Sequence, residues 1–198
     1  MSQDQKRQAI IEAALKRFAH FGVAKTTMSE IGNDLAISKA LLYYYFPDKF
    51  SLYAVVLKTI IEESEATSIP IVEAKENPFE AIQLFLEHRT EFIIKYHHIL
   101  EFLRTKQSLP DELKSLFADV RQRELRRIQA IIQKGVTAGH IHTSQPKQKA
   151  SLLFDCLDGL RRVQFDQSAA LFPDKELFRS LLKREKELSQ IFLKGLSA

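Results

Sequence analysis

The sequence has little of what builds covalent cross-links, metal sites and phosphate-binding loops. Cys156 is the only cysteine in 198 residues, which excludes a disulfide framework and a thiolate metal cage and indicates a reducing compartment. The six glycines form no phosphate-binding loop and no G-x-S-x-G elbow, and neither H-E-x-x-H nor a pair of E-x-x-H motifs occurs. We therefore expect no enzyme, no metal and no cofactor.

Long apolar runs are also lacking. No stretch approaches about 18 uninterrupted apolar residues, and the N-terminal segment MSQDQKRQAIIEAALKRF is charged and amphipathic. We expect a cytoplasmic chain that is neither exported nor membrane-spanning. A hydrophobic content of 45% suffices for one domain or two closely packed ones. The formal charge of +4 is compatible with a nucleic-acid partner, but many ordinary proteins are equally basic.

Helical spacing of apolar residues runs through nearly the whole chain, whereas strict alternation is almost absent. Gly22 is expected to end the first helix as a left-handed cap. Thr27 lies three residues before Glu30, a capping-box spacing that begins a short second helix. Ser38 can cap a third helix that runs to about Phe46. A long fourth helix follows until the segment SIPIVEAKENP breaks it.

Prolines mark the helix starts beyond this break, because the first turn of a helix does not need a proline's missing N–H. Each precedes an amphipathic segment, 79–104, 111–137, 147–168 and 174–195 in turn; the prolines are Pro78, Pro110, Pro146 and Pro173. The first segment is expected to divide near Tyr96, and Gly139 to cap the second. The prediction is an all-α protein of about nine helices. A three-helix helix-turn-helix domain (1–47) is joined by a long helix to a helical ligand-binding and dimerisation domain (48–198).

The segment SKALLYYYFPDK fits the second helix of a DNA-binding helix-turn-helix, which enters the major groove N-terminus first. Such a helix needs an apolar back, here Ile37, Leu42 and Phe46, and a polar or aromatic front. Tyrosine hydroxyls can donate to phosphates, and the Lys49 ammonium can approach another phosphate. The alternative is that the three tyrosines of the helix pack their rings on a core and keep their hydroxyls exposed to solvent. The position just after a short helix pair favours the DNA-binding interpretation.

From about Lys6 to Leu57 the sequence resembles the TetR family of bacterial transcriptional regulators. The matching features are spread over IIEAALKRFAHFGVAKTTMSEIGNDLAISKALLYYYFPDKFSLY. The resemblance implies that Thr27, Tyr43 and Lys49 hold DNA phosphates. It also implies which side chains meet base edges: Lys39, Ala40, Leu41 and Tyr44. Ser38, which caps this helix, and Tyr45, which flanks its front, complete the expected DNA-binding set.

The sequence departs from the family at two positions of the helix-turn-helix. Gly32 stands where alanine is common, and a glycine in a helix interior costs up to about 1 kcal/mol relative to alanine. Ala36 stands where the family has a glycine in the turn, so it would pay a little for a left-handed conformation. Neither change removes a DNA contact.

Residues 1–50 are only modestly positive, so one headpiece would bind weakly and two on a dimer would read a palindromic site. An intramolecular core is one explanation of the apolar stripes on the last two helices, but the resemblance favours the other, which is that these helices form the dimer contact. The candidate interface residues are Leu153, Leu157, Leu160, Leu181, Leu188 and Phe192.

Aromatic residues of the middle helices could line a pocket for an apolar or aromatic effector, although most of them are expected to belong simply to the core. The candidates are Phe85, His88, Phe92, Tyr96, Phe102, Phe117 and Phe154. Arginines between residues 121 and 127 could attract an anionic effector, or form a solvated face. We expect a repressor that a small-molecule ligand releases from its operator. The alternative is a helical ligand-binding or scaffold protein whose headpiece has lost DNA affinity.

Overall fold

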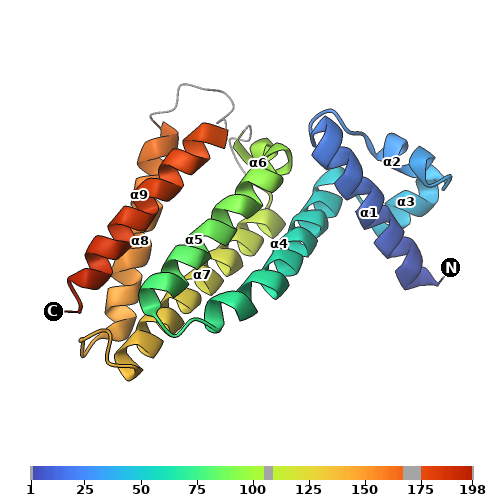
Figure 1. Cartoon of the computed structure of the whole chain (residues 1–198). Coiled ribbons are helices and arrows are strands. Elements are labelled where there is room, and N and C mark those ends of the chain that lie inside the picture. The colour runs from blue at the N-terminus through green and yellow to red at the C-terminus, as the bar shows by residue number, and fades with distance from the viewer. Residues whose placement is uncertain (1, 105–108, 167–174, 198) are drawn as a thin grey trace. The chain divides into compact units, whose positions relative to one another are not determined.

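The computed structural model describes residues 2–104, 109–166 and 175–197, and these residues form nine α-helices and no β-strand. The all-α prediction is therefore confirmed. No described helix is long and apolar enough to cross a membrane. The helices (Figure 1) are α1 (Gln3–Phe21), α2 (Met28–Asp34), α3 (Lys39–Tyr45), α4 (Lys49–Glu73), α5 (Pro78–Lys95), α6 (His97–Arg104), α7 (Asp111–Thr137), α8 (Pro146–Asp166) and α9 (Lys175–Lys194).

The end of α4 lies inside the segment that was expected to break this helix, SIPIVEAKENP at residues 68–78. The helix nevertheless continues through Pro70 before it ends at Glu73. A proline inside a helix removes one N–H donor and crowds the carbonyl one turn earlier. The last turn is supported from outside, because Lys134 Nζ donates to the Glu73 carbonyl oxygen at 2.9 Å. A contact from a distant helix therefore accompanies the extra turn.

Most other helix boundaries follow the local signals. The first segment of the second half divides at Tyr96, and α7 begins directly after Pro110, as predicted. Gly139 after α7 has a φ of 76°, as expected for a cap. Gly22 has a φ of 79° but an extended ψ of 155°, so the predicted left-handed cap is wrong in its ψ. Pro173 lies outside the described residues.

The chain divides into two compact units. Unit 1 comprises Met1–Ser64 and Tyr96–Ala118, and unit 2 comprises Glu65–Lys95 and Asp119–Ala198. Both α4 and α7 contribute residues to each unit. The functional boundary predicted between residues 47 and 48 stays a prediction.

Unit 1 is organised around Tyr53 of α4. In this unit α1 packs on α2 and α6, and α2 packs on α3. The Tyr53 ring meets Phe18 and Phe102 edge-on, with centroids 6.0 and 5.3 Å away. Its hydroxyl donates to the Ile99 carbonyl oxygen of α6 at 2.7 Å, and burial raises the pKa of this hydroxyl far above its ordinary value. Tyr53 therefore joins α1, α4 and α6 in one core.

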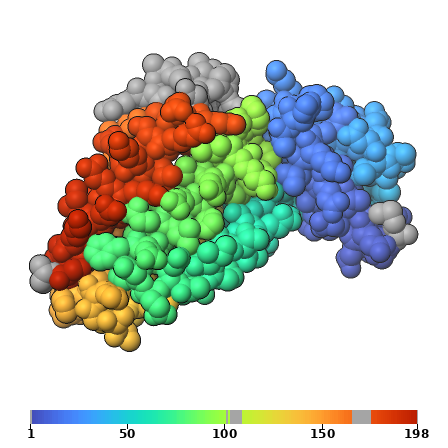
Figure 2. Space-filling view, viewed as in Figure 1, coloured from blue at the N-terminus to red at the C-terminus, as the bar shows by residue number. Residues whose placement is uncertain are grey.

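Unit 2 is a helical bundle in which α9 packs along α5 and α8. Figure 2 shows α9 (red) lying beside α5 (green) on one face of this unit. Gly135 allows α7 to approach its neighbours, because a Cβ there would lie 2.7 Å from Ile141 Cδ1 and 2.9 Å from Pro78 Cγ. The buried core includes Ile82, Phe85, Leu86, Ile128, Ile132, Ile141, Leu153, Phe154, Leu157 and Leu193.

The turn between α2 and α3 is closed by backbone hydrogen bonds. The Leu35 and Ile37 N–H groups donate to the Gly32 carbonyl oxygen at 3.2 and 3.0 Å, and Ala36 N–H donates to Asn33 at 3.1 Å. Ala36 has a φ of 51°, alone among the described non-glycine residues in being positive. A left-handed conformation costs an L-residue about 1 kcal/mol or more. The expected strain at Ala36 is therefore present.

We predict that Gly32→Ala and Ala36→Gly each raise the free energy of unfolding by about 0.5–1 kcal/mol. The new methyl group at Gly32 would meet Ile37 O at 3.5 Å and Leu42 Cδ2 at 3.6 Å, which are ordinary contacts. At Ala36 the glycine relieves the positive φ. Urea unfolding measures both, with Gly22→Ala as a control that should destabilise because φ is 79° there. Destabilisation by Gly32→Ala would contradict the packing described for α2 and α3.

Candidate nucleic-acid interface and effector region

Helix α3 buries one face and exposes the other. Leu42 is fully buried and the C-cap residue Phe46 is 2% exposed, whereas Tyr44 is 69% exposed and Tyr43 40%. The predicted apolar back and outward front are therefore both present. Among the other predicted DNA-binding residues of this segment, the half-buried ones are Leu41 and Tyr45 and the exposed ones are Ser38, Lys39 and Ala40.

The beginning of α3 is fixed by Ser38, whose hydroxyl accepts from the Leu41 N–H at 3.2 Å. This is the N-cap that the sequence predicted. A Ser N-cap stabilises a helix by roughly 1 kcal/mol relative to alanine. For a helix of seven residues this is a substantial share of its stability. Ser38 therefore has a structural role whether or not it touches DNA.

The exposed aromatic rings of α3 are held by neighbours. The Lys39 ammonium lies 5.8 Å from the Tyr43 ring centroid, and the Tyr44 and Tyr45 rings meet edge-on at 5.3 Å. Gln3 of α1 donates through Nε2 to the Tyr44 hydroxyl at 3.3 Å. No ion pair joins Lys39 to a carboxylate within the described residues, so its charge is available to a ligand. Gln3 was missed in the sequence because a contact between positions so far apart leaves no local signal.

Thr27 is engaged in the predicted capping box. Its hydroxyl accepts from the Glu30 N–H at 3.3 Å and donates to Glu30 Oε2 at 2.8 Å. The Thr27 N–H also donates to Glu30 Oε2, at 2.7 Å. The backbone bond from Thr27, joined by the hydroxyl bond, lowers the pKa of the Glu30 carboxyl. A DNA phosphate would therefore have to accept the Thr27 proton in place of Glu30.

Lys49, the first residue of α4, points its ammonium at backbone carbonyls rather than away from the chain. Nζ lies 2.9 Å from Val23 O, 3.1 Å from Thr26 O and 3.4 Å from Ala24 O. An ammonium has three donors, and these three carbonyls all belong to the connection between α1 and α2. Lys49 thus fixes this connection from α4, a role that the sequence did not suggest because its partners are main-chain atoms.

A second clamp fixes α2 against α1. Arg17 of α1 forms a forked pair with Asp34: Nε donates to Oδ2, and Nη2 donates to Oδ1 at 2.7 Å. Glu30 lies 3.6 Å away on the same guanidinium. The hydrogen bond from Arg17 lowers the pKa of the Asp34 carboxyl. Exposed pairs of this kind contribute little stability, so the main effect is on the orientation of α2.

The residues predicted to line an effector pocket fall in both units. Unit 2 holds Phe85, His88, Phe92 and Phe154, and unit 1 holds Tyr96, Phe102 and Phe117. Phe85 and Phe154 belong to the buried core of unit 2. The Arg127 guanidinium carbon lies 5.8 Å from the Phe85 ring centroid, and that of Arg121 lies 4.4 Å from Phe154. The single pocket proposed for all seven residues stays a prediction.

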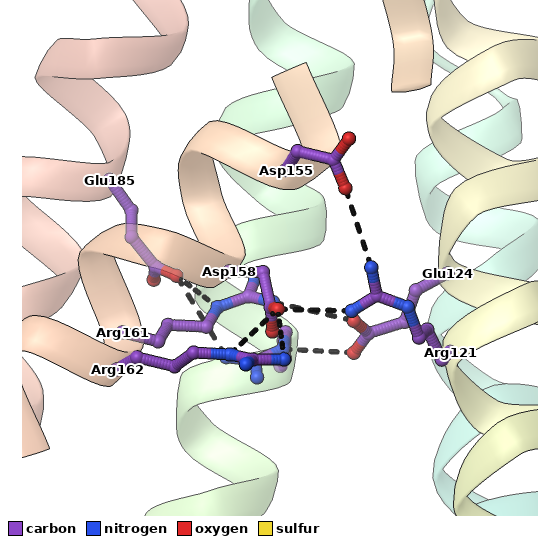
Figure 3. A network of polar contacts seen from close by, with 8 residues as sticks. Arg121, Glu124, Asp155, Asp158, Arg161, Arg162 and Glu185 are labelled. Carbon is purple, nitrogen blue, oxygen red and sulfur yellow. Dashed lines mark hydrogen bonds and ion pairs between the residues drawn. The ribbon is translucent and has the colours of Figure 1, made fainter. Parts of the chain in front are cut away.

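A network of charged side chains in unit 2 was not foreseen from the sequence (Figure 3). Arg161 of α8 donates to Glu185 of α9 at 2.5 Å, and its Nη1 lies 3.5 Å from Glu124 Oε2 of α7. Arg89 of α5 donates to the same Glu124 at 2.9 Å. Arg161 is 6% exposed and Glu185 is fully buried. Four helices are therefore joined by two cations and two carboxylates of balanced charge.

The electrostatics of this network follow from burial and mutual attraction. Burial alone would raise the pKa of Glu124, but the charges of Arg89 and Arg161 outweigh it and lower that pKa. Burial and repulsion from Arg89 lower the pKa of Arg161. Glu185 Oε2 is buried and has no hydrogen-bond partner among the residues that the structure describes. Outside this group, Arg121 pairs with Asp158 at 3.0 Å.

We predict that Arg161→Met destabilises the protein by about 3–5 kcal/mol, because it leaves buried carboxylates uncompensated. Adding Glu185→Leu should recover most of this loss, since the second variant removes the carboxylate that lost its partner. Arg162→Met is the matched control, because the Arg162 side chain is 72% exposed. Urea unfolding of the wild-type protein, Arg161→Met, Glu185→Leu alone, the double variant and the control measures the coupling. Additive losses in the double variant would contradict a coupled buried pair.

The residues predicted for the dimer interface differ in their burial. Leu153, Leu157 and Leu181 are buried within unit 2 itself, so the intramolecular core left open by the sequence accounts for these three. The half-buried members of the set are Leu160, Leu188 and Phe192. Among the described side chains of α8 and α9, the exposed large apolar ones are Leu152 (50%), Val163 (47%) and Ile191 (64%).

Comparison with known proteins connects this geometry to a family. Residues 10–56, which include α2, α3 and the start of α4, match the model described as bacterial regulatory proteins, tetR family. The transcriptional regulator RutR of Escherichia coli K12 is 33% identical over 115 residues, 54% of this chain and 53% of that protein. The uncharacterised regulator YuxN of Bacillus subtilis is 29% identical over 124 residues, 62% of this chain and 43% of that protein. The chain thus spans about half the length of these relatives.

Among solved structures, a transcriptional regulator from Cytophaga hutchinsonii is 30% identical, with a TM-score of 0.86 over 98% of this chain and 99% of that one. The match therefore covers both the helix-turn-helix and the helical bundle. The family model, the regulators named among the relatives and this full-length likeness agree. The chain belongs to the TetR family of bacterial transcriptional regulators.

Proposed function

We propose that this chain acts in the cytoplasm as a dimeric repressor, which binds a palindromic operator through α3 and leaves it when a small molecule binds. The observation that carries the proposal is the outward face of α3. Tyr43 and Tyr44 are exposed there while Leu42 is fully buried, and Lys39 is exposed beside them. A helix with an apolar back and a polar, cationic front suits the major groove.

The roles within this face divide by chemistry. Lysine can donate to guanine O6 and N7, so Lys39 is the proposed reader of base edges, with Ala40, Leu41 and Tyr44 around it. The Tyr43 and Tyr45 hydroxyls and Thr27 are proposed to hold phosphates, which sets the register on the duplex. For Lys49 two roles compete. Its ammonium is bound to three carbonyls, which favours a structural role over the phosphate contact expected from the sequence.

We predict that Lys39→Ala weakens operator binding by roughly 1–3 kcal/mol and leaves binding to random DNA nearly unchanged. Lys58→Ala is the matched control and should change neither affinity. Lys58 is an exposed lysine of α4, and it lies about 13 Å further along that helix than Lys49. Fluorescence anisotropy over a salt series measures both. Equal losses on operator and random DNA would contradict a base-reading role for Lys39.

The same assay decides the role of Lys49. If Lys49 binds a phosphate, Lys49→Ala should weaken binding on all sequences and lower the salt slope by about one. If it only fixes the α1–α2 connection, thermal stability should fall while the salt slope stays unchanged. We expect the second result, because removing the ammonium leaves three carbonyls without their donor.

Dimerisation is proposed to use an apolar stripe on α8. Leu152, Cys156, Gly159 and Val163 recur at intervals of four, three and four residues, so they share one helix face. A Cβ on Gly159 would meet no atom within 4 Å, which leaves room for a second helix. With Ile191 of α9 beside it in the proposed interface, this stripe replaces the more deeply buried leucines predicted from the sequence. Large apolar side chains exposed together typically mark an interface.

We predict that Leu152→Glu and Val163→Glu each convert the dimer to monomers, because a carboxylate would be buried without a partner. Ile71→Glu on α4 is the matched control: Ile71 is also a large exposed apolar residue, at 48%, but lies outside the stripe. Analytical ultracentrifugation measures the outcome. A dimer that withstands both stripe variants would move the interface elsewhere.

Release by a small molecule is supported by structures of the same fold that contain a bound small molecule. A neighbour from Saccharomonospora viridis, 19% identical, was solved with choline, and SmeT, 20% identical, with triclosan. A ligand changes DNA affinity only if it binds the two headpiece arrangements unequally. Helix α4 is the proposed link, because it runs from Lys49 in unit 1 to Glu73 in unit 2.

A further inference from the structure

A cavity of about 190 Å³ lies within unit 2, where the last turn of α4, the start of α5 and the second half of α7 meet. In Figure 1 the end of α4 and the start of α5 lie at the same end of this unit. None of the aromatic residues predicted to line a pocket belongs to its wall. The lining residues are Val72, Glu73, Lys75, Glu76, Pro78, Ala81, Arg127, Ala130, Ile131 and Lys134.

The wall of this cavity is apolar inside and charged toward solvent. Val72, Ala81 and Ile131 are 2%, 3% and 7% exposed. Among the charged lining residues, the Arg127 side chain is 13% exposed, whereas that of Glu76 is 83% exposed. The most buried lining charge is therefore positive, and the carboxylates lie at the rim.

The rim charges are largely satisfied within the chain. Lys134 Nζ donates to Glu73 O at 2.9 Å and lies 3.3 Å from Glu76 Oε1. Lys75 lies 3.3 Å from Glu80 Oε2. Both lysines of the wall therefore have partners near the rim, whereas Arg127 lies deeper and pairs with Glu65.

Arg127 is only partly compensated. Its Nη2 lies 3.7 Å from Glu65 Oε1, and the same carboxylate is shared with Arg123, whose Nε lies 3.1 Å from Oε2. Within the described part of the chain, Arg123 Nη2 is buried and has no hydrogen-bond partner. Two guanidinium groups therefore share the Glu65 carboxylate. The charge of Arg127 also helps to lower the pKa of Glu124, but that carboxylate already pairs with Arg89 and Arg161. An added anion could therefore accept hydrogen bonds from Arg127, because guanidinium donors match the two oxygens of a carboxylate.

We infer that this cavity binds a small monocarboxylate with a compact apolar body, whose carboxylate pairs with Arg127. The body would lie against Val72, Ala81 and Ile131. The size fits, because an apolar protein cavity of roughly 150 Å³ already accommodates benzene. This cavity has room for a ring of that size and a carboxylate. Binding of the carboxylate does not depend on the proposed function. Only the effect of the carboxylate on DNA affinity rests on the proposed function.

The test uses the full-length protein without DNA and three probes that share one ring but differ in charge: benzoate, benzyl alcohol and benzylamine. Isothermal titration calorimetry should show benzoate binding about tenfold or more tightly than benzyl alcohol, because it adds charge-assisted hydrogen bonds. Benzylamine should bind most weakly. Equal affinities for the three probes, or no benzoate binding, would overturn the inference.

Variants locate the site. Arg127→Gln should cost benzoate about tenfold or more in affinity and leave benzyl alcohol unchanged. Arg126→Gln is the matched control, because Arg126 is exposed and its Nε donates to Gln122 O of its own helix, at 3.4 Å. Ala81→Leu fills the cavity and should abolish binding of both probes even if Arg127→Gln fails to fold. Equal loss in Arg126→Gln, or undiminished binding in Ala81→Leu, would place the probe elsewhere.

Anisotropy on operator DNA separates this inference from the proposed function. Benzoate that binds and lowers DNA affinity supports both. Benzoate that binds to a protein without DNA affinity supports the site and refutes the proposed function. DNA binding without any benzoate binding refutes the site alone.

Discussion

The burial of Leu42 and Phe46 sets the orientation of α3, and the proposed DNA interface depends on it. A helix of seven residues is too short to be stable alone in water, so packing must hold it. With Leu42 fully buried and Phe46 2% exposed, the rotation of α3 about its axis is determined. Lys39, Ala40 and Tyr44 are then outside because the opposite side is occupied by core.

Charged side chains make different kinds of contact in the two units. In unit 1, charged side chains act on the backbone and on helix orientation: Lys49 holds the α1–α2 connection and Arg17 holds α2. In unit 2, Arg161 and Glu185 place a buried ion pair between α8 and α9. A buried pair is weak evidence for stability, since apolar replacements are often as stable. We expect the pair to favour one register of α8 on α9, because a carboxylate without its guanidinium would be buried uncompensated.

Local signals predicted local structure and missed what depends on distant parts of the chain. The Ser38 cap and the Thr27–Glu30 capping box were both found where they were predicted. Such caps can be predicted because their hydrogen bonds join residues only two or three positions apart in the sequence. The continuation of α4 past Pro70 could not be predicted, since its last turn is held by Lys134 from another helix. The apolar periodicity of α8 includes both Leu152 and Leu153, and it could not predict that Leu153 is buried within unit 2 while Leu152 is exposed.

Sequence-specific DNA binding by two chains is the central property of the proposed repressor, and fluorescence anisotropy tests it directly. The purified protein is titrated against DNA flanking its own gene, with random duplex as competitor and at several salt concentrations. We predict tight, competitor-resistant binding at two chains per site, weakening steeply with salt. No salt-sensitive DNA binding, even at low salt, would contradict the account and leave a helical ligand-binding protein whose headpiece no longer reads DNA.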